Sequence, residues 1–86
     1  MKIIWSDIAW LEYVEWESRD KKTLKKINEL IKDISRNGAT EGIGHPEKLK
    51  YNDCYSRRID KANRLVYDID EEGNLLIASC CGHYEN

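Results

Sequence analysis

The sequence predicts one α+β domain spanning residues 1–86. In it, two N-terminal helices pack on a mainly antiparallel five-stranded sheet, in the order β-α-α-β-β-β-β. Three observations support this. The spacing of apolar residues is helical in the first half and alternating in the second. The later strands are joined by short turns such as Glu71–Asn74, which force neighbouring strands to be antiparallel. A chain of 86 residues also suits one small core.

The first half predicts a short strand at residues 2–5 and then two helices. Ser6 is placed to cap a helix that begins at Asp7, and Asp20 is placed to cap a second one. The second helix carries one apolar stripe: Leu24, Ile27, Leu30, Ile31 and Ile34. Gly38 is expected to end it, because glycine readily adopts the backbone conformation that terminates helices.

The second half predicts a loop and then four strands. The stretch "NGATEGIGHPE" holds three glycines and the only proline, which is typical of a loop. Alternating or apolar runs then predict strands at residues 48–51, 55–60, 63–70 and 75–81. Since the last of these is apolar on both faces, we expect it to be a central strand of the sheet.

Composition excludes several classes of protein. A hydrophobic content of 41% is too high for a disordered chain. No apolar stretch reaches the ~20 residues of a membrane span, and the start of the chain turns polar too soon for a signal peptide. We therefore expect a cytoplasmic protein without membrane contact.

The three cysteines, Cys54, Cys80 and Cys81, are expected to be reduced thiols. A zinc site built from them with His45 and His83 is an alternative. The adjacency of Cys80 and Cys81 disfavours it, because zinc ligands are usually separated by two to four residues. We expect neither a metal nor a cofactor.

The charges are unevenly distributed although the net charge is only −2. Residues 21–36 carry six bases and two acids, whereas residues 65–86 carry five acids and no base. A lysine-rich helix is most simply a solvated face, but a local basic patch can also bind a polyanion.

Alternation along the strands sorts the side chains of the second half into two faces. The apolar set expected to face the helices is Leu49, Ile59, Leu65, Tyr67 and Ile69. The opposite set, expected on the open face, is Lys48, Lys50, Ser56, Arg58, Arg64 and Val66. Arg57 has the parity of Ile59, so it should point the other way from Arg58 or lie at an edge. A cationic face near the loop that carries Glu47 predicts an anion site with a carboxylate beside it. The period alone does not place His83.

Six segments in order resemble the YoeB/Txe toxins of the RelE superfamily. They are "MKIIWSDIAW", "KKINELIKD", "EGIGHPEKLK", "SRRID", "NRLVYDID" and "LLIASCCGHY", and together they cover nearly the whole chain. The resemblance implies a RelE-like fold and a bacterial type II toxin that cleaves mRNA in the ribosomal A site. It also implies neutralisation by a YefM/Axe-type antitoxin and a homodimer.

The same resemblance implies roles for individual residues. Glu47 corresponds to the family's general base and His83 to its general acid. Arg64 and Tyr84 correspond to the other catalytic positions. Lys50 and Arg58 correspond to phosphate-binding positions, which the strand period extends to Lys48.

This chemistry needs these residue types. RNA cleavage without a metal uses the neighbouring 2′-hydroxyl as nucleophile, so a base must take its proton and an acid must protonate the departing 5′-oxygen. Cations must stabilise the extra charge at phosphorus. The expected products are a 2′,3′-cyclic phosphate and a free 5′-hydroxyl.

The chain departs from the family pattern at three places: Glu85-Asn86 follow the terminal "HY", the turn before "SRR" is shorter than usual, and Tyr55 stands where tryptophan is common. The rival interpretation is an RNA- or ribosome-binding module, or an inactive toxin, that does not cut. Replacing Glu47 or His83 would then leave its biological effect intact.

Overall fold

The computed structural model describes residues 1–50 and 52–82. Its elements are β1 (Ile3–Trp5), α1 (Asp7–Arg19), α2 (Lys21–Asn37), β2 (Glu47–Lys48), β3 (Tyr55–Arg58), β4 (Arg64–Ile69) and β5 (Leu75–Ser79). The predicted order of elements is confirmed. The strands of the second half are shorter than the alternating runs suggested, because backbone pairing ends before the apolar pattern does.

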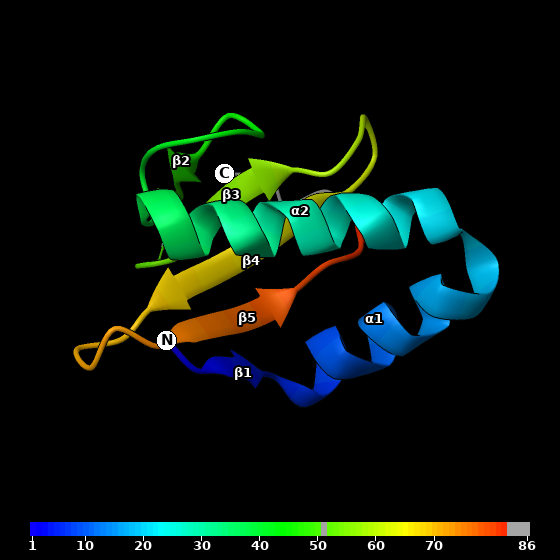
Figure 1. Cartoon of the computed structure of the whole chain (residues 1–86), viewed down its shortest axis with the longest axis horizontal. Coiled ribbons are helices and arrows are strands. Elements are labelled where there is room, and N and C mark those ends of the chain that lie inside the picture. The colour runs from blue at the N-terminus through cyan, green and yellow to red at the C-terminus, as the bar shows by residue number, and fades with distance from the viewer. Residues whose placement is uncertain (51, 83–86) are drawn as a thin grey trace.

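The sheet has the strand order β1-β5-β4-β3-β2, as Figure 1 shows. The pairs β2–β3, β3–β4 and β4–β5 are antiparallel, as the short turns predict. The pair β1–β5 is parallel and sets Ile3 opposite Leu75. The sheet is therefore mixed but mainly antiparallel, and β5 lies inside it, as its apolar sequence predicts.

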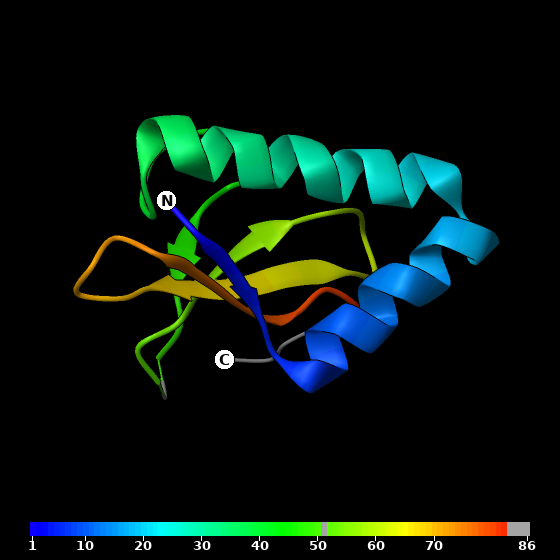
Figure 2. The same ribbon diagram turned by 60° about the horizontal axis from the view of Figure 1, so that its bottom comes forward.

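Helix α2 lies across one face of the sheet, and α1 packs beside the end of β5 (Figures 1 and 2). Both predicted caps are confirmed: the Ser6 hydroxyl accepts a hydrogen bond from the Ala9 N–H at 3.0 Å. The Asp20 carboxylate accepts one from the Lys22 N–H, also at 3.0 Å. These caps satisfy backbone donors that the first turn of a helix leaves unpaired, so each helix begins where the sequence predicts.

The core lies between α2 and the inner face of the sheet. The α2 side chains Ile27, Leu30 and Ile34 are fully buried there, against Leu65 and Tyr67 of β4. Complete burial of each aliphatic side chain contributes about 1.5–3 kcal/mol, so this stripe is the main attachment of α2 to the sheet.

Cys54, Cys80 and Cys81 are free thiols, as predicted. Within the described part of the chain, no helix is both long enough and apolar enough to cross a membrane.

Candidate functional site

The face of the sheet away from α2 carries Glu47, Arg58 and Arg64. Glu47 is directly opposite Ser56 in the β2–β3 pair, and Arg58 is directly opposite Arg64 in the β3–β4 pair. Directly opposite residues share a face, and so do residues two apart along a strand. The three predicted site residues therefore lie on one face, and the side chains of Glu47 and Arg58 are exposed.

Of the two lysines predicted for this face, Lys48 lies differently. Lys48 is opposite Tyr55, whose ring stacks on Tyr67 on the helix side of the sheet. The Lys48 ammonium lies 5.3 Å from the centre of the Tyr55 ring and 3.9 Å from the Asp53 carboxylate. Its expected position beside Arg58 is therefore wrong, because β2 is only two residues long and its register sets Glu47 on that face. Lys50 follows β2 and is exposed.

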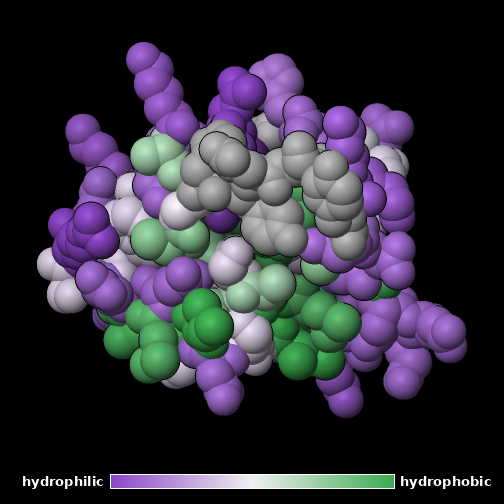
Figure 3. Space-filling view, turned by 180° about the vertical axis from the view of Figure 1, so that it is seen from behind, coloured by the Kyte–Doolittle hydropathy of each residue, from purple (hydrophilic) through white to green (hydrophobic). Residues whose placement is uncertain are grey.

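This face is also less open than parity predicts. Ser56 and Val66, expected to be exposed on it, are only 6% and 3% exposed. Leu49 is buried as predicted, but it does not belong to the hydrophobic cluster under the helices. Figure 3 views this side of the molecule, where hydrophobic side chains gather toward the edge that carries β1.

The chain that leaves β5 is attached beside Arg64. The Gly82 N–H donates to the Asn63 side-chain oxygen at 2.8 Å, and the Arg64 N–H donates to the Gly82 carbonyl at 2.9 Å. Gly82 is the last described residue. His83 and Tyr84, the predicted acid and aromatic partner, lie outside the described residues.

The turn before Arg64 is built around the Asp60 carboxylate. It accepts hydrogen bonds from the Ala62 and Asn63 N–H groups, both at 2.8 Å. Desolvation acts to raise the pKa of Asp60, but these bonds and those from the Asn63 side chain hold it below its ordinary value. The Arg64 guanidinium donates to the Asp60 carbonyl at 2.8 Å, which sets the direction of the arginine side chain.

Helix α1 holds the end of β5 from the other side. The Trp16 indole N–H donates to the Cys80 carbonyl at 2.9 Å, and the Cys80 N–H donates to the Glu12 carboxylate at 2.8 Å. Burial, then the charge of Glu12 and the neighbouring Cys81, raises the pKa of the Cys80 thiol to about 12. Cys80 is consequently a packed, neutral thiol, and the backbone three residues before His83 is fixed to α1.

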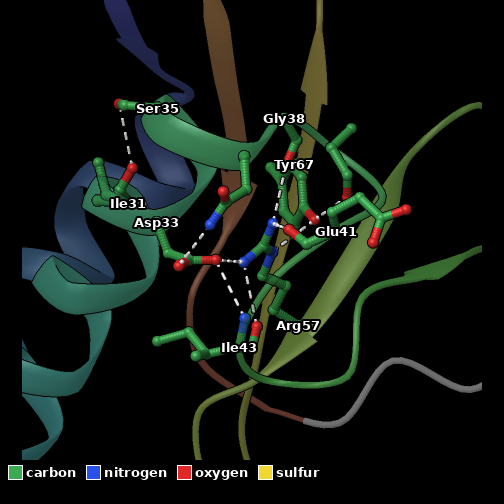
Figure 4. Close-up of polar contacts among 10 residues, drawn as sticks. Ile31, Asp33, Ser35, Gly38, Glu41, Ile43, Arg57 and Tyr67 are labelled. Carbon is green, nitrogen blue, oxygen red and sulfur yellow. Dashed lines mark hydrogen bonds and ion pairs between the residues drawn. The ribbon is translucent and has the colours of Figure 1, made fainter.

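Sequence reasoning missed the part played by Arg57. Its parity predicts the side of the sheet on which it lies, but not that it is fully buried against the end of α2 (Figure 4). Its hydrogen bond to Asp33 is the largest cause that lowers the pKa of that carboxyl. Desolvation raises the pKa of Tyr67, which the nearby Arg57 opposes. The only signal in the sequence is the match of Arg57 parity with the apolar positions.

A shallow groove follows the loop between α2 and β2 and ends at Glu47. It is lined by Thr40, Glu41, Gly42, Ile43, Gly44, His45, Pro46 and Glu47. His45 has a φ of 52°, an unusual conformation for a residue with a side chain. Among the residues that the structure describes, no group of three or more histidine, cysteine, aspartate or glutamate side chains is arranged to hold a metal ion.

The chain was compared with known families, proteins and structures. The model of the YoeB-like toxins of bacterial type II toxin–antitoxin systems matches residues 5–84. Toxin YoeB of Escherichia coli K12 is 50% identical over 86 residues, covering 98% of this chain and all of that protein. A YoeB dimer from Staphylococcus aureus superposes with a TM-score of 0.91 at 52% identity, covering 98% of each chain. A heterotetrameric YoeB–YefM toxin–antitoxin complex from the same organism gives a TM-score of 0.90 at 51% identity, with the same coverage.

Proposed function

Because the chain belongs to the family of YoeB-like toxins of bacterial type II toxin–antitoxin systems, we propose that it is a ribosome-dependent endoribonuclease that cuts mRNA in the A site. The observation that carries the proposal is the common face of Glu47, Arg58 and Arg64, with Gly82 hydrogen-bonded beside Arg64. An exposed carboxylate on the same sheet face as two arginines suits a phosphodiester flanked by a hydroxyl that must lose a proton.

The reaction divides between a base and an acid. Glu47 takes the proton of the 2′-hydroxyl, which attacks the adjacent phosphorus, and His83 gives a proton to the departing 5′-oxygen. At neutral pH a carboxylate is an ionised base, whereas an imidazole can supply a proton. The products are a 2′,3′-cyclic phosphate and a 5′-hydroxyl, and no metal or cofactor takes part.

The cations stabilise the charge that develops at phosphorus. Arg58 and Arg64 present planar guanidinium groups, whose paired N–H donors match two phosphate oxygens. Within the described residues, no ion-pair or hydrogen-bond partner occupies the Arg58 side chain, which supports a role in holding phosphate. Tyr84 orients the scissile nucleotide, and Lys50 binds the RNA backbone at the margin of the site.

The test is cleavage of a defined mRNA on purified ribosomes. Wild type, Glu47→Gln and His83→Gln are compared with Glu41→Gln, which removes an exposed charge from the same loop and serves as the control. We expect wild type and the control to release fragments with a free 5′-hydroxyl, which polynucleotide kinase labels without prior phosphatase. We expect both site variants to lose at least about a hundredfold in rate, as is typical for a missing general acid or base.

Equal cutting by wild type and both site variants would remove Glu47 and His83 from these roles. Inhibition of translation by all of the proteins, without any cut, would instead favour a binding module. Either result contradicts the proposed mechanism without affecting the family assignment.

We also propose that a YefM/Axe-type antitoxin neutralises this chain and that the toxin forms a homodimer in the cytoplasm. The YoeB–YefM complex and the YoeB dimer from Staphylococcus aureus support this assembly. Light scattering of the toxin, alone and after co-expression with the antitoxin encoded beside it, gives the masses directly. A monomer in both samples would refute the dimer.

A further inference from the structure

Two consecutive arginines of β3 lie in opposite environments. Arg58 is exposed on the proposed RNA face, whereas Arg57 has no exposed surface at all. Arginine is almost never fully buried unless it is paired, because removing a guanidinium from water is costly. The surroundings of Arg57 must therefore supply a complete set of acceptors.

The Arg57 guanidinium uses all five of its N–H donors (Figure 4). Nε donates to the Tyr67 hydroxyl at 2.9 Å. One terminal nitrogen donates to the Asp33 carboxylate and to the Ile43 carbonyl, the latter at 3.1 Å. The other donates to the carbonyls of Gly38 at 2.8 Å and Glu41 at 2.6 Å. Three of the five acceptors are thus backbone carbonyls of residues 38–43, a loop without secondary structure of its own.

Tyr67 and Asp33 complete this arrangement from β4 and α2. The Tyr67 hydroxyl donates to the Ala39 carbonyl at 2.7 Å, and the Asp33 carboxylate accepts from the Ile43 N–H at 3.0 Å. We call this set of contacts between Arg57, Tyr67, Asp33 and the loop of residues 38–43 the arginine clamp. It connects α2, β3 and β4 to one stretch of loop backbone.

The loop comes so close to the clamp only because it has a glycine at the tightest point. A Cβ atom at Gly42 would lie 1.8 Å from the Asp33 carboxylate oxygen and 2.9 Å from an Arg57 terminal nitrogen. Neither distance is tolerated between non-bonded atoms. The close approach of the loop and the buried guanidinium are therefore parts of one arrangement.

The clamped loop leads directly to Glu47. The Gly44 carbonyl accepts a hydrogen bond from the Arg58 N–H at 2.6 Å, and only His45 and Pro46 separate Gly44 from Glu47. Proline restricts its own φ and the conformation of the residue before it, so this connection has little freedom. A displacement of residues 38–43 is consequently transmitted to the Glu47 backbone.

We propose that Arg57 is a positioning residue, which holds the loop so that the Glu47 carboxylate stays in reach of the 2′-hydroxyl that it deprotonates. The proposal rests on the proposed function, because Glu47 acts as a base only there. Arg57 does not face the RNA, so it acts through the loop alone. A displacement of about 1 Å at a reacting group can cost a hundredfold in rate, so a loop held by several hydrogen bonds has direct value for catalysis.

The test compares the same chemical change, deletion of a tyrosine hydroxyl, inside and outside the clamp. Tyr67→Phe removes the clamp contacts to Arg57 and Ala39. Tyr13→Phe, the matched control, removes one hydrogen bond of 2.7 Å to Asn28 between the helices. Arg57→Lys keeps the positive charge but has three N–H donors on one nitrogen in place of the five of the planar guanidinium, so it cannot make all of the clamp contacts. Each protein is assayed at a temperature where thermal melting shows it fully folded, by amide hydrogen exchange and by mRNA cleavage.

In Tyr67→Phe we expect the Ile43 and Arg58 amides to exchange at least about tenfold faster, because two hydrogen bonds of the Tyr67 hydroxyl are lost and one buried hydrogen bond alone corresponds to a factor of roughly ten. We expect kcat to fall by about tenfold or more with KM unchanged, because RNA binding residues are intact. Arg57→Lys should show larger changes in the same direction, and Tyr13→Phe should match wild type in both measurements.

Wild-type exchange at the Ile43 amide in Tyr67→Phe and Arg57→Lys would overturn the proposal. So would a loosened loop with an unchanged kcat, or equal losses in Tyr13→Phe. If wild type cuts no mRNA at all, the proposed function fails and with it the catalytic role of the clamp. The exchange measurements then decide separately whether Arg57 holds the loop.

Discussion

Alanine in place of Gly44 tests how tightly the loop before Glu47 is packed. Gly44 has a φ of 82°, in the left-handed region, and an added Cβ would lie 2.8 Å from Leu30 Cδ2 and 3.2 Å from the Arg58 carbonyl oxygen. Gly73 is the matched control. Its φ is 81°, but apart from Gly73 and its two chain neighbours no heavy atom lies within 4 Å of the position that a Cβ would take.

The two substitutions share one energetic cost and differ in another. The left-handed conformation costs a residue with a side chain about 1–2 kcal/mol, at both positions. Overpacking against Leu30 and the backbone adds about 1–3 kcal/mol at Gly44 only. We therefore expect Gly44→Ala to lower the free energy of unfolding by about 2–5 kcal/mol, and Gly73→Ala by about 1–2 kcal/mol. An 86-residue domain has roughly 4–13 kcal/mol in total, so Gly44→Ala removes a large fraction of it and Gly73→Ala a smaller one.

Urea unfolding followed by tryptophan fluorescence gives both free energies. The Gly44 variant should also lose mRNA cleavage at temperatures where it is folded, because the Gly44 carbonyl fixes the Arg58 backbone. Equal destabilisation of the two variants would show that the loop is not packed as described. Full cleavage activity in folded Gly44→Ala would refute the link between this loop and the site.

Three further outcomes follow from buried and charged groups. Trp16→Phe leaves the buried Cys80 carbonyl without its donor, so urea unfolding should show a loss of about 1–3 kcal/mol, whereas Trp10→Phe, at a position 49% exposed, should show little change. Iodoacetamide at pH 8 should label Cys80 only after unfolding, because its pKa is raised to about 12, and labelling of the folded protein at the unfolded rate would contradict this. Hydrogen bonds from Thr23 lower the pKa of Asp20 below its ordinary 3.8. Its stabilising contribution is therefore complete above the unfolded pKa and is lost as the pH falls through the lower folded value, so Asp20→Asn should flatten the decline of the urea midpoint below about pH 4.

Much of the fold follows from local signals. Ser6, Asp20 and Gly38 define the helix ends because capping depends on residues a few positions apart, which the sequence shows directly. The partner of β1 does not follow in this way. Its parallel pairing with β5 joins Ile3 to Leu75, and no short-range pattern specifies a contact over such a separation.

The sequence predicts the candidate site only in part. Alternation correctly sets Arg58 and Arg64 on one face, because a strand has a fixed period of two. It fails at Lys48, where the register of a two-residue strand decides the face. Alternation also predicts the face on which Arg57 lies but not its burial in a hydrogen-bonded cluster. Its five acceptors come from three segments of the chain that meet only when the chain is folded.

Because two consecutive residues of β3 are arginines, the arginines alone do not specify the register of this strand. Other residues in and beside β3 must specify it. If the strand slipped by one position, Arg58 would enter the clamp and one guanidinium would simply replace another. The same slip would turn Tyr55 away from Tyr67 and expose Ile59, and it would carry the Asp60 carboxylate toward the core. The packing of Tyr55 and Ile59, rather than the positive charges, therefore determines which of the two arginines is exposed on the proposed RNA face.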